Sequence, residues 1–151
     1  MLHIALKADF PCLTETNYHV TSPQDVQYNC IAWAAGEDDV WWWPDEMLYA
    51  HWPDDAMRQV TIAAFVQAFS TKGYSPCEDG SLEQGFEKIA LYALNEKPTH
   101  AARQLPDGIW TSKLGKNHDI SHTIEALDGP VYGSVAMFLK RAIYKADLSI
   151  F

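Results

Sequence analysis

The spacing of apolar residues predicts two helices in the first half of the chain. In residues 57–72, apolar side chains recur at the interval of one helix face, and Gly73 ends the run. The residues on this face are Val60, Ala64, Phe65, Ala68 and Phe69. An earlier helix is predicted to end at Ala35, with Gly36 as its C-cap.

The start of that earlier helix has two alternatives. Ser22 followed by Pro23 makes a good helix entry, because serine caps free amides and proline is tolerated at the first helical position. In the other alternative the helix begins near Tyr28 or Asn29, and the preceding residues are loop. The choice decides whether Cys30 lies about two turns into the helix or in its first turn.

Strand-like patterns follow from Phe86 onward, where apolar residues alternate with other residues as far as the break at 95–98. Two further strand-like segments, residues 99–105 and 109–114, lie on either side of Pro106-Asp107-Gly108. A Pro-Asp-Gly turn between two such segments is typical of a hairpin.

The last part of the chain is less regular. Ser121 is predicted to cap a helix that runs to Leu127, and residues 131–144 fit either a helix or a strand. Helices come first and antiparallel strands after, an order typical of α+β proteins. We therefore expect one domain, residues 1–151, in which N-terminal helices pack on a small antiparallel sheet.

Composition supports a packed globule and an acidic surface. Of 151 residues, 48% are apolar and 13% aromatic, and 20 acidic residues against 11 basic ones give a formal charge of -9. This charge is a poor match for nucleic acids or anionic membranes, but it suits a basic partner or simply solubility. The chain lacks a signal-peptide pattern and the roughly 20 consecutive apolar residues of a membrane span, so a cytoplasmic location is predicted.

The cysteines and histidines do not form a recognisable metal motif. The three cysteines, Cys12, Cys30 and Cys77, include no Cys-x-x-Cys pair, and no glycine-rich phosphate loop is present, so no cofactor is predicted. His118 and His122 are four residues apart, but the expected cap at Ser121 would keep them off a common helix face. We interpret both as surface histidines.

Cys30 and His100 are the candidate reactive pair. A thiol becomes a useful nucleophile when its pKa of about 8.5 is lowered, or when a neighbouring base takes its proton. Cys30 lies near a helix start, and His100 opens a strand of the predicted hairpin. Taken alone, Cys30 is more typical of a small core residue. The candidates for the residue that orients the imidazole are Ser112, Gln104, Asn117 and Asp119.

These residues resemble the papain-like cysteine peptidase superfamily, in the broad sense that includes small bacterial amidases. The resemblance rests on Cys30 followed by Trp33-Ala34, on Gln24 six residues earlier, on His100, and on the segment Ser112-Lys-Leu-Gly115. It implies a papain-like core, with Cys30 as nucleophile and His100 as base and then acid. It also implies Gln24 as a donor to the oxyanion, and Ser112 in the place where the papain pattern carries asparagine.

A tryptophan-rich segment follows the predicted cysteine helix. Three adjacent tryptophans cannot all face one core, so this segment is the candidate wall of a substrate groove. The tryptophans concerned are Trp41, Trp42, Trp43 and Trp52. The acidic run at 37–39 would favour a basic substrate. The function predicted is a cysteine peptidase or amidase acting by thiol acyl transfer. The alternative is a non-enzymatic acidic interaction protein of inhibitor or immunity type, or a papain-like fold without activity.

Overall fold

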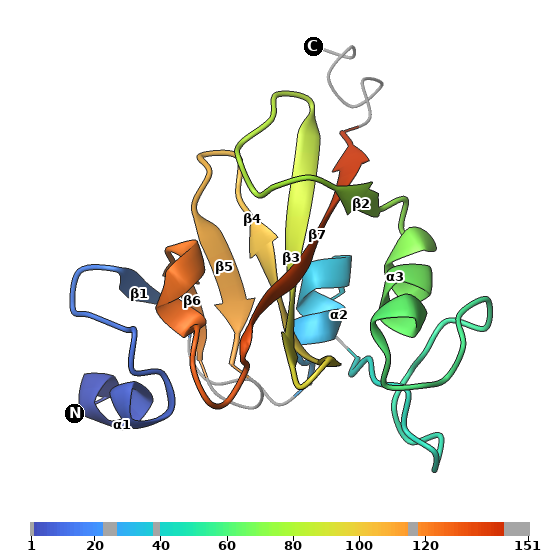
Figure 1. Ribbon diagram of the computed structural model, residues 1–151, viewed down its shortest axis with the longest axis horizontal. Helices are drawn as coiled ribbons and strands as arrows, with labels where there is room; N and C mark the ends of the chain where they lie inside the picture. The colour runs from blue at the N-terminus through green and yellow to red at the C-terminus, as the bar shows by residue number, and fades with distance from the viewer. Residues whose placement is uncertain (1, 23–26, 38–39, 115–117, 144–151) are drawn as a thin grey trace.

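The computed structural model describes residues 2–22, 27–37, 40–114 and 118–143, and a sheet dominates it (Figure 1). The helices are α1 (Leu2–Asp9), α2 (Cys30–Ala35), α3 (Ile62–Ser70) and the 3-10 helix η1 (Ile124–Leu127). The strands are β1 (Tyr18–Ser22), β2 (Ser75–Cys77), β3 (Phe86–Leu94), β4 (Lys97–Gln104), β5 (Trp110–Lys113), β6 (Asp119–His122) and β7 (Ser134–Ala142).

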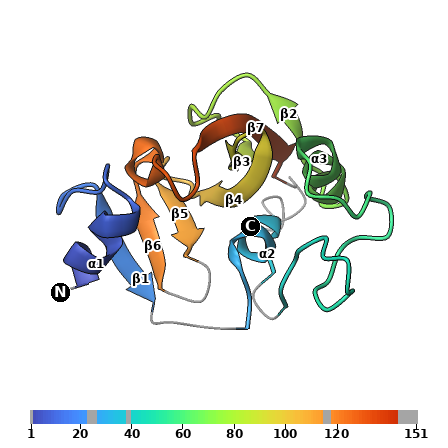
Figure 2. The ribbon, with the colours of Figure 1, turned by 60° about the horizontal axis from the view of Figure 1, so that its bottom comes forward.

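Within the described residues, seven strands form one antiparallel sheet in the order β1-β6-β5-β4-β3-β7-β2. The long strand β3 lies between β4 and β7, and the short strands β1 and β2 are at the two edges. Figure 2 shows α1 near the β1 end of this sheet and α3 near the opposite end. Of the helices, α1 and η1 share one apolar cluster, and α2 and α3 share another.

The two faces of β3 enter two different apolar clusters. Ile89 and Leu91 pack with α2 and α3 on one face, whereas Ala90 and Tyr92 belong to a cluster on the other face. That second cluster includes residues of α1 and η1. Because both faces of β3 are buried, its central residues form a continuous buried run with no exposed position between them.

The strands β4 and β5 diverge, and this divergence creates the place where the candidate site lies. They form the predicted hairpin, which is confirmed. The residues of this pair that lie opposite each other are next to the turn, Arg103 with Thr111 and Gln104 with Trp110. Beyond these pairs α2 contacts both strands. The helix α2 thus packs against the part of β4 that precedes Arg103 and against β5.

The predicted fold, in which N-terminal helices pack on a small antiparallel sheet with a papain-like core, is wrong. The sheet is the larger component, and the helices are few and short. Three of its strands, β1, β2 and β6, come from segments that sequence patterns did not predict as strands. The ambiguous segment 131–144 supplies β7, which pairs with β3 along most of its length.

Of the helices predicted at 57–72 and 121–127, the first is confirmed and the second is wrong over part of its length. The helix at 57–72 is confirmed as α3, although it begins at Ile62, where the Thr61 hydroxyl accepts a hydrogen bond from the Ala64 amide at 3.1 Å. The helix expected from Ser121 to Leu127 is wrong over its first half, since β6 continues to His122 before η1 begins. Among the described residues, no helix is both long and apolar enough to cross a membrane.

Candidate active site

Cys30 is the first residue of α2, so the later of the two predicted helix starts is the observed one. Asn29 precedes it in extended conformation and caps the helix, with its Oδ1 accepting from the Ala32 amide at 3.2 Å. Gly36 ends the helix in the left-handed region, with φ of +91°. Cys30 is therefore presented by a short helix that is capped at both ends.

The Cys30 sulfur lies against the backbone of β4. It accepts hydrogen bonds from the backbone amides of Ala101 and Ile31, and its side chain is buried. Burial raises the pKa of the Cys30 thiol to about 11, because desolvation outweighs those amides and the positive charge of Lys113. Near neutral pH the thiol is consequently protonated.

His100, the neighbour of Ala101 on β4, is fully buried in a polar pair with β5. Its Nε2 lies 2.9 Å from the Ser112 hydroxyl oxygen. Burial, and secondly the nearby His122, hold the pKa of His100 well below its ordinary value. Among the described residues its other ring nitrogen, Nδ1, has no hydrogen-bond partner, so the thiol and the imidazole are not hydrogen-bonded to each other.

His122 continues this polar chain, and its interpretation as a surface histidine is corrected by the structure. It is buried on β6, its Nε2 lies 2.7 Å from the Ser112 hydroxyl, and its Nδ1 lies 2.7 Å from the Thr123 carbonyl oxygen. Burial lowers the pKa of His122 to about 4. The signal that would have found it is its alternation with Ile120, which places both side chains on one face of a strand.

Tyr132 clamps the His100 ring and was not predicted from sequence. The two rings stack with centroids 4.0 Å apart and an interplanar angle of 10°. Tyr92, the cross-strand neighbour of His100, meets the imidazole edge-on at 5.3 Å. The Thr99 hydroxyl donates to the Tyr132 carbonyl at 2.6 Å, which fixes the backbone of the clamp. The imidazole plane is set by these aromatic neighbours as well as by Ser112.

A pocket of about 460 Å³ opens beside Cys30. Its lining is mostly apolar and comprises Asn29, Cys30, Trp41, Trp43, Asp45, Tyr49, Ala50, Thr99 and Tyr132. The predicted substrate-binding tryptophans divide into two groups. Trp41 and Trp43 line the pocket, whereas Trp42 and Trp52 are buried in the core that α2 and α3 share.

Among the described residues, the candidate orienters Asp119 and Gln104 have hydrogen-bond partners other than His100. Asp119 accepts a hydrogen bond from the Tyr28 hydroxyl at 2.6 Å. Asn117 and the predicted oxyanion donor Gln24 lie outside the described residues. Of the predicted catalytic residues, the structure brings together His100 and Ser112, and it places the Cys30 sulfur against the backbone of Ala101, the residue after His100.

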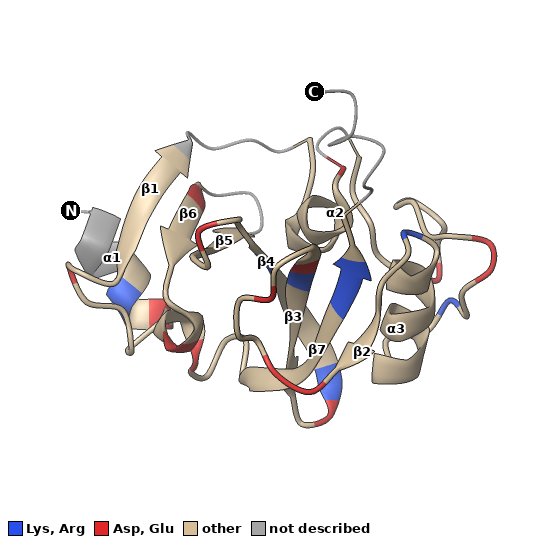
Figure 3. Ribbon diagram, turned by 90° about the horizontal axis from the view of Figure 1, so that it is seen from above, with Lys and Arg blue, Asp and Glu red and all other residues tan. Residues whose placement is uncertain are grey.

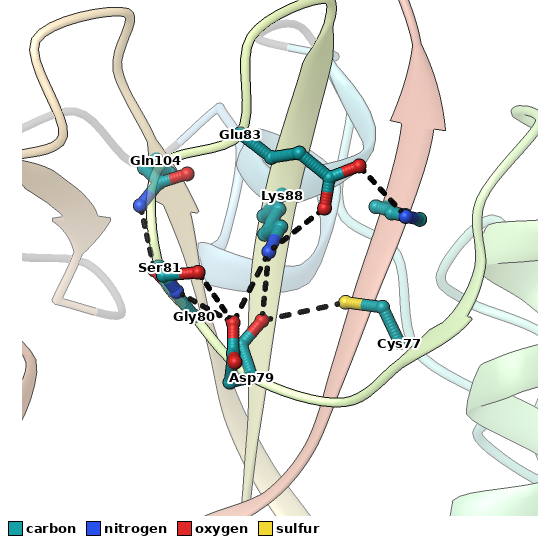
Figure 4. A network of polar contacts seen from close by, with 8 residues as sticks. Cys77, Asp79, Gly80, Ser81, Glu83, Lys88 and Gln104 are labelled. Atoms are coloured by element: carbon teal, nitrogen blue, oxygen red, sulfur yellow. Dashed lines mark hydrogen bonds and ion pairs between the residues drawn. The ribbon is translucent and has the colours of Figure 1, made fainter.

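Gln104 belongs to a separate polar network around Lys88 (Figure 4). Its Nε2 donates to the Gly80 carbonyl at 2.8 Å. The buried Lys88 ammonium donates to the Asp79 carbonyl at 3.0 Å and lies 3.6 Å from a Glu83 carboxylate oxygen. This network ties the loop before β3 to the sheet, which accounts for the burial of Lys88 and of Gln104.

The two buried histidines make stability depend on pH. Their pKa values in the folded protein lie below the ordinary value of 6.5, so the unfolded chain binds more protons as pH falls below about 7. Their contribution is therefore intact above pH 6.5 and is lost as the pH falls toward 4. We expect the free energy of unfolding to drop by about 1 kcal/mol per histidine between pH 7 and pH 5.5.

Urea denaturation at the two pH values measures this drop. In the His122→Gln variant the pH-dependent loss should shrink by about 1 kcal/mol, because one of the two protonation sites is gone. A loss of the same size in the variant and the parent protein would contradict the assignment of His122 as a neutral buried histidine.

Comparison with known proteins identifies a family model that matches most of the chain. A family model described as a domain of unknown function, DUF7689, matches residues 19–140, a range that includes Cys30, His100, Ser112 and His122. No curated protein matches the chain, and no solved structure matches it.

Proposed function

We propose that this chain, which belongs to the DUF7689 family of domains of unknown function, is a cysteine hydrolase that cleaves an amide or ester by thiol acyl transfer. One observation carries the proposal. His100 is bound through Nε2 to Ser112, its Nδ1 has no partner among the described residues, and the next residue along β4 contacts the Cys30 sulfur. A nucleophile, a base and a residue that orients the base are the parts that acyl transfer requires.

In the proposed mechanism His100 Nδ1 takes the thiol proton while the Cys30 sulfur attacks the carbonyl carbon. The resulting imidazolium then gives that proton to the leaving amine or alcohol, and a thioester remains on Cys30. Water, activated by His100, attacks the thioester and releases the acid and the free thiol. Gln24 is kept as an oxyanion donor on the sequence resemblance alone.

The resting pair is neutral in this mechanism. Burial raises the pKa of Cys30 and lowers that of His100, so proton transfer accompanies the attack and does not precede it as a stable ion pair. A thiol of this kind reacts slowly with general alkylating reagents at neutral pH. It reacts faster with an acyl donor that fits the pocket and brings its carbonyl to the sulfur.

The pocket favours a substrate with an apolar group beside the scissile bond. The polar side chains in its lining already have partners in the protein: Asn29 bonds to Trp42 and Ala32, Asp45 to Arg58, and Thr99 to Tyr132. The aromatic surfaces of the lining therefore offer most of the binding energy. We propose a peptide or amide substrate with an aliphatic or aromatic side chain.

Acylation by p-nitrophenyl esters tests the proposal without knowledge of the natural substrate. Mass spectrometry after peptide digestion should find the acyl group on Cys30, and p-nitrophenyl hexanoate should react faster than the acetate because its chain enters the pocket. His100→Gln should slow acylation of Cys30 by about 100-fold.

The matched control is a Cys12→Ser/Cys77→Ser variant, which keeps Cys30 as the remaining cysteine and should retain the full rate. Equal, slow labelling of all three thiols in the parent protein, or a His100→Gln rate equal to the parental one, would refute the hydrolase.

The proposed place of action is the cytoplasm, where thiols stay reduced. The three cysteines are all free, and Cys30 must remain a thiol for the chemistry above. A peptide or amide substrate and a reducing compartment are thus parts of one proposal, and neither nucleic acid nor membrane belongs to it.

A non-enzymatic acidic interaction protein remains the second candidate, and one feature favours it. Met47, Leu48 and Tyr49 are adjacent and 67%, 69% and 85% exposed, and Tyr49 also lines the pocket. Figure 3 shows acidic residues mostly on loops, while several basic residues lie on the strands. Lys140 and Arg141 of β7 are ion-paired with Glu83 and Glu87. The formal charge of -9 suits a basic partner. Calorimetric titration with a lysine-rich peptide, at low and high salt, would detect binding of a basic partner.

A further inference from the structure

We infer that His122 is a positioning residue that acts through Ser112 to fix the tautomer of His100, with the proton on Nε2 and the lone pair on Nδ1. The inference deepens the proposed function and rests on it for its purpose, but the hydrogen-bond geometry stands by itself. The series of hydrogen bonds runs from the Thr123 carbonyl through His122 and Ser112 to His100. The Thr123 carbonyl oxygen sets the direction of the series because that atom can only accept a hydrogen bond.

The first link fixes the His122 tautomer. A carbonyl oxygen can only accept, so the Nδ1 of His122, 2.7 Å from the Thr123 oxygen, must carry a hydrogen. A neutral imidazole has one N–H, and the Nε2 of His122 is then an acceptor. The low pKa of the buried His122 keeps the ring neutral near pH 7.

The second and third links carry this polarity to His100. The Ser112 hydroxyl has one hydrogen, which goes to the His122 Nε2 at 2.7 Å. The Ser112 oxygen is therefore an acceptor toward the His100 Nε2 at 2.9 Å, so that nitrogen carries the N–H. In the neutral His100 ring the lone pair lies on Nδ1, the nitrogen without a partner among the described residues.

The relay also supports the charged state of His100 that the mechanism needs. When Nδ1 takes the proton from Cys30, the N–H of Nε2 becomes a donor from a cation, and its bond to Ser112 strengthens. Ser112 can accept this bond fully because its own hydrogen is held by His122. The stacked Tyr132 keeps the ring in the plane that this chain of bonds requires. No ionised carboxylate is needed next to the imidazole, in contrast to a Ser-His-Asp triad.

Nitrogen-15 NMR of the imidazole rings tests the inference directly on the full chain. Two-bond couplings from ring protons to ring nitrogens distinguish the two neutral tautomers at pH 7, and His100→Gln and His122→Gln assign the signals. The expected result is Nε2–H on His100 and Nδ1–H on His122. The opposite tautomer on either ring would overturn the relay.

Variants at Ser112 separate positioning from structural support. Ser112→Ala removes the hydroxyl and should leave His100 in a mixture of tautomers, with acylation of Cys30 slowed by at least about tenfold. Ser112→Thr keeps a hydroxyl and should restore both the single tautomer and the rate. If Ser112→Ala keeps the Nε2–H tautomer, His122 does not act through Ser112 and the inference fails.

The outcomes are distinguishable from failure of the proposed hydrolase. A parent protein that shows the expected tautomers but no acylation of Cys30 supports the relay and refutes the hydrolase. A parent protein that acylates Cys30 with Nδ1–H on His100 supports the hydrolase and refutes the relay.

Discussion

Replacing Gly133 by alanine should destabilise the protein by about 4 kcal/mol, as a left-handed conformation and a backbone clash act together. Gly133 has φ of +76°, and a Cβ there would lie 2.0 Å from the Ala93 carbonyl oxygen and 3.0 Å from the Leu94 Cα. Those atoms belong to the central strand β3, which is held on both sides and cannot retreat. Urea denaturation followed by tryptophan fluorescence measures the loss.

Gly85 supplies the matched control. It also lies in the left-handed region, with φ of +85°, but an added Cβ would meet no atom within 4 Å. Gly85→Ala should therefore cost only about 1 kcal/mol, from the backbone conformation alone. Equal losses in the two variants would show that the clash at Gly133 is relieved by a shift of the loop. Because Tyr132 precedes Gly133 and stacks on His100, the Gly133 variant should also slow Cys30 acylation.

The parts of the fold that could be predicted from sequence are those whose signals are local and long. The apolar face of α3 repeats over two turns, and a Pro-Asp-Gly turn joins β4 to β5, so each pattern is sufficient by itself. The strands that were missed are short or depend on distant partners. β2 and β6 have too few residues to show a period, and they exist because β7 and β5 offer them an edge.

β7 illustrates how tertiary context decides an ambiguous segment. Val135, Phe138 and Leu139 have a spacing that suits a helix, yet the segment is a strand. β3 is buried on both faces and needs a partner along its second edge, and β7 supplies that partner. The error in fold class follows from this, because a helix here would have left the sheet small.

The sequence pointed to residues of the candidate site where a reactive group stands in an apolar segment. Cys30, His100 and Ser112 were selected in this way, and the structure shows the hydrogen bond between His100 and Ser112. His122 was missed because it lies on β6, a strand that was not predicted, and because its link to His100 passes through the Ser112 hydroxyl of β5. Tyr132 was missed because nothing in its own segment indicates a stacked ring.

The shortened helix that presents Cys30 depends on Asn29, so Asn29→Ala should destabilise the protein by about 3 kcal/mol. The Asn29 side chain caps α2 and also forms two hydrogen bonds with the backbone of Trp42. Its Oδ1 accepts from the Trp42 amide at 3.0 Å, and its Nδ2 donates to the Trp42 carbonyl at 2.8 Å. All of these groups are buried. Alanine would remove the cap and leave the Trp42 amide and carbonyl without partners, and each unpaired buried group costs about 1 kcal/mol or more.

Thr61→Ala is the matched control for the cap alone. Thr61 caps α3 through the Ala64 amide, but it is exposed and water can replace its hydroxyl, so its loss should cost about 1 kcal/mol. Urea denaturation of both variants gives the comparison, and losses of equal size would mean that Asn29 acts only as a cap.

Since Asn29 joins the Cys30 helix to the segment with Trp41 and Trp43, its loss should also slow acylation by the hexanoate ester more than by the acetate. The pocket wall and the nucleophile would then no longer be held in one arrangement, whereas Thr61→Ala should leave the ratio of the two rates unchanged.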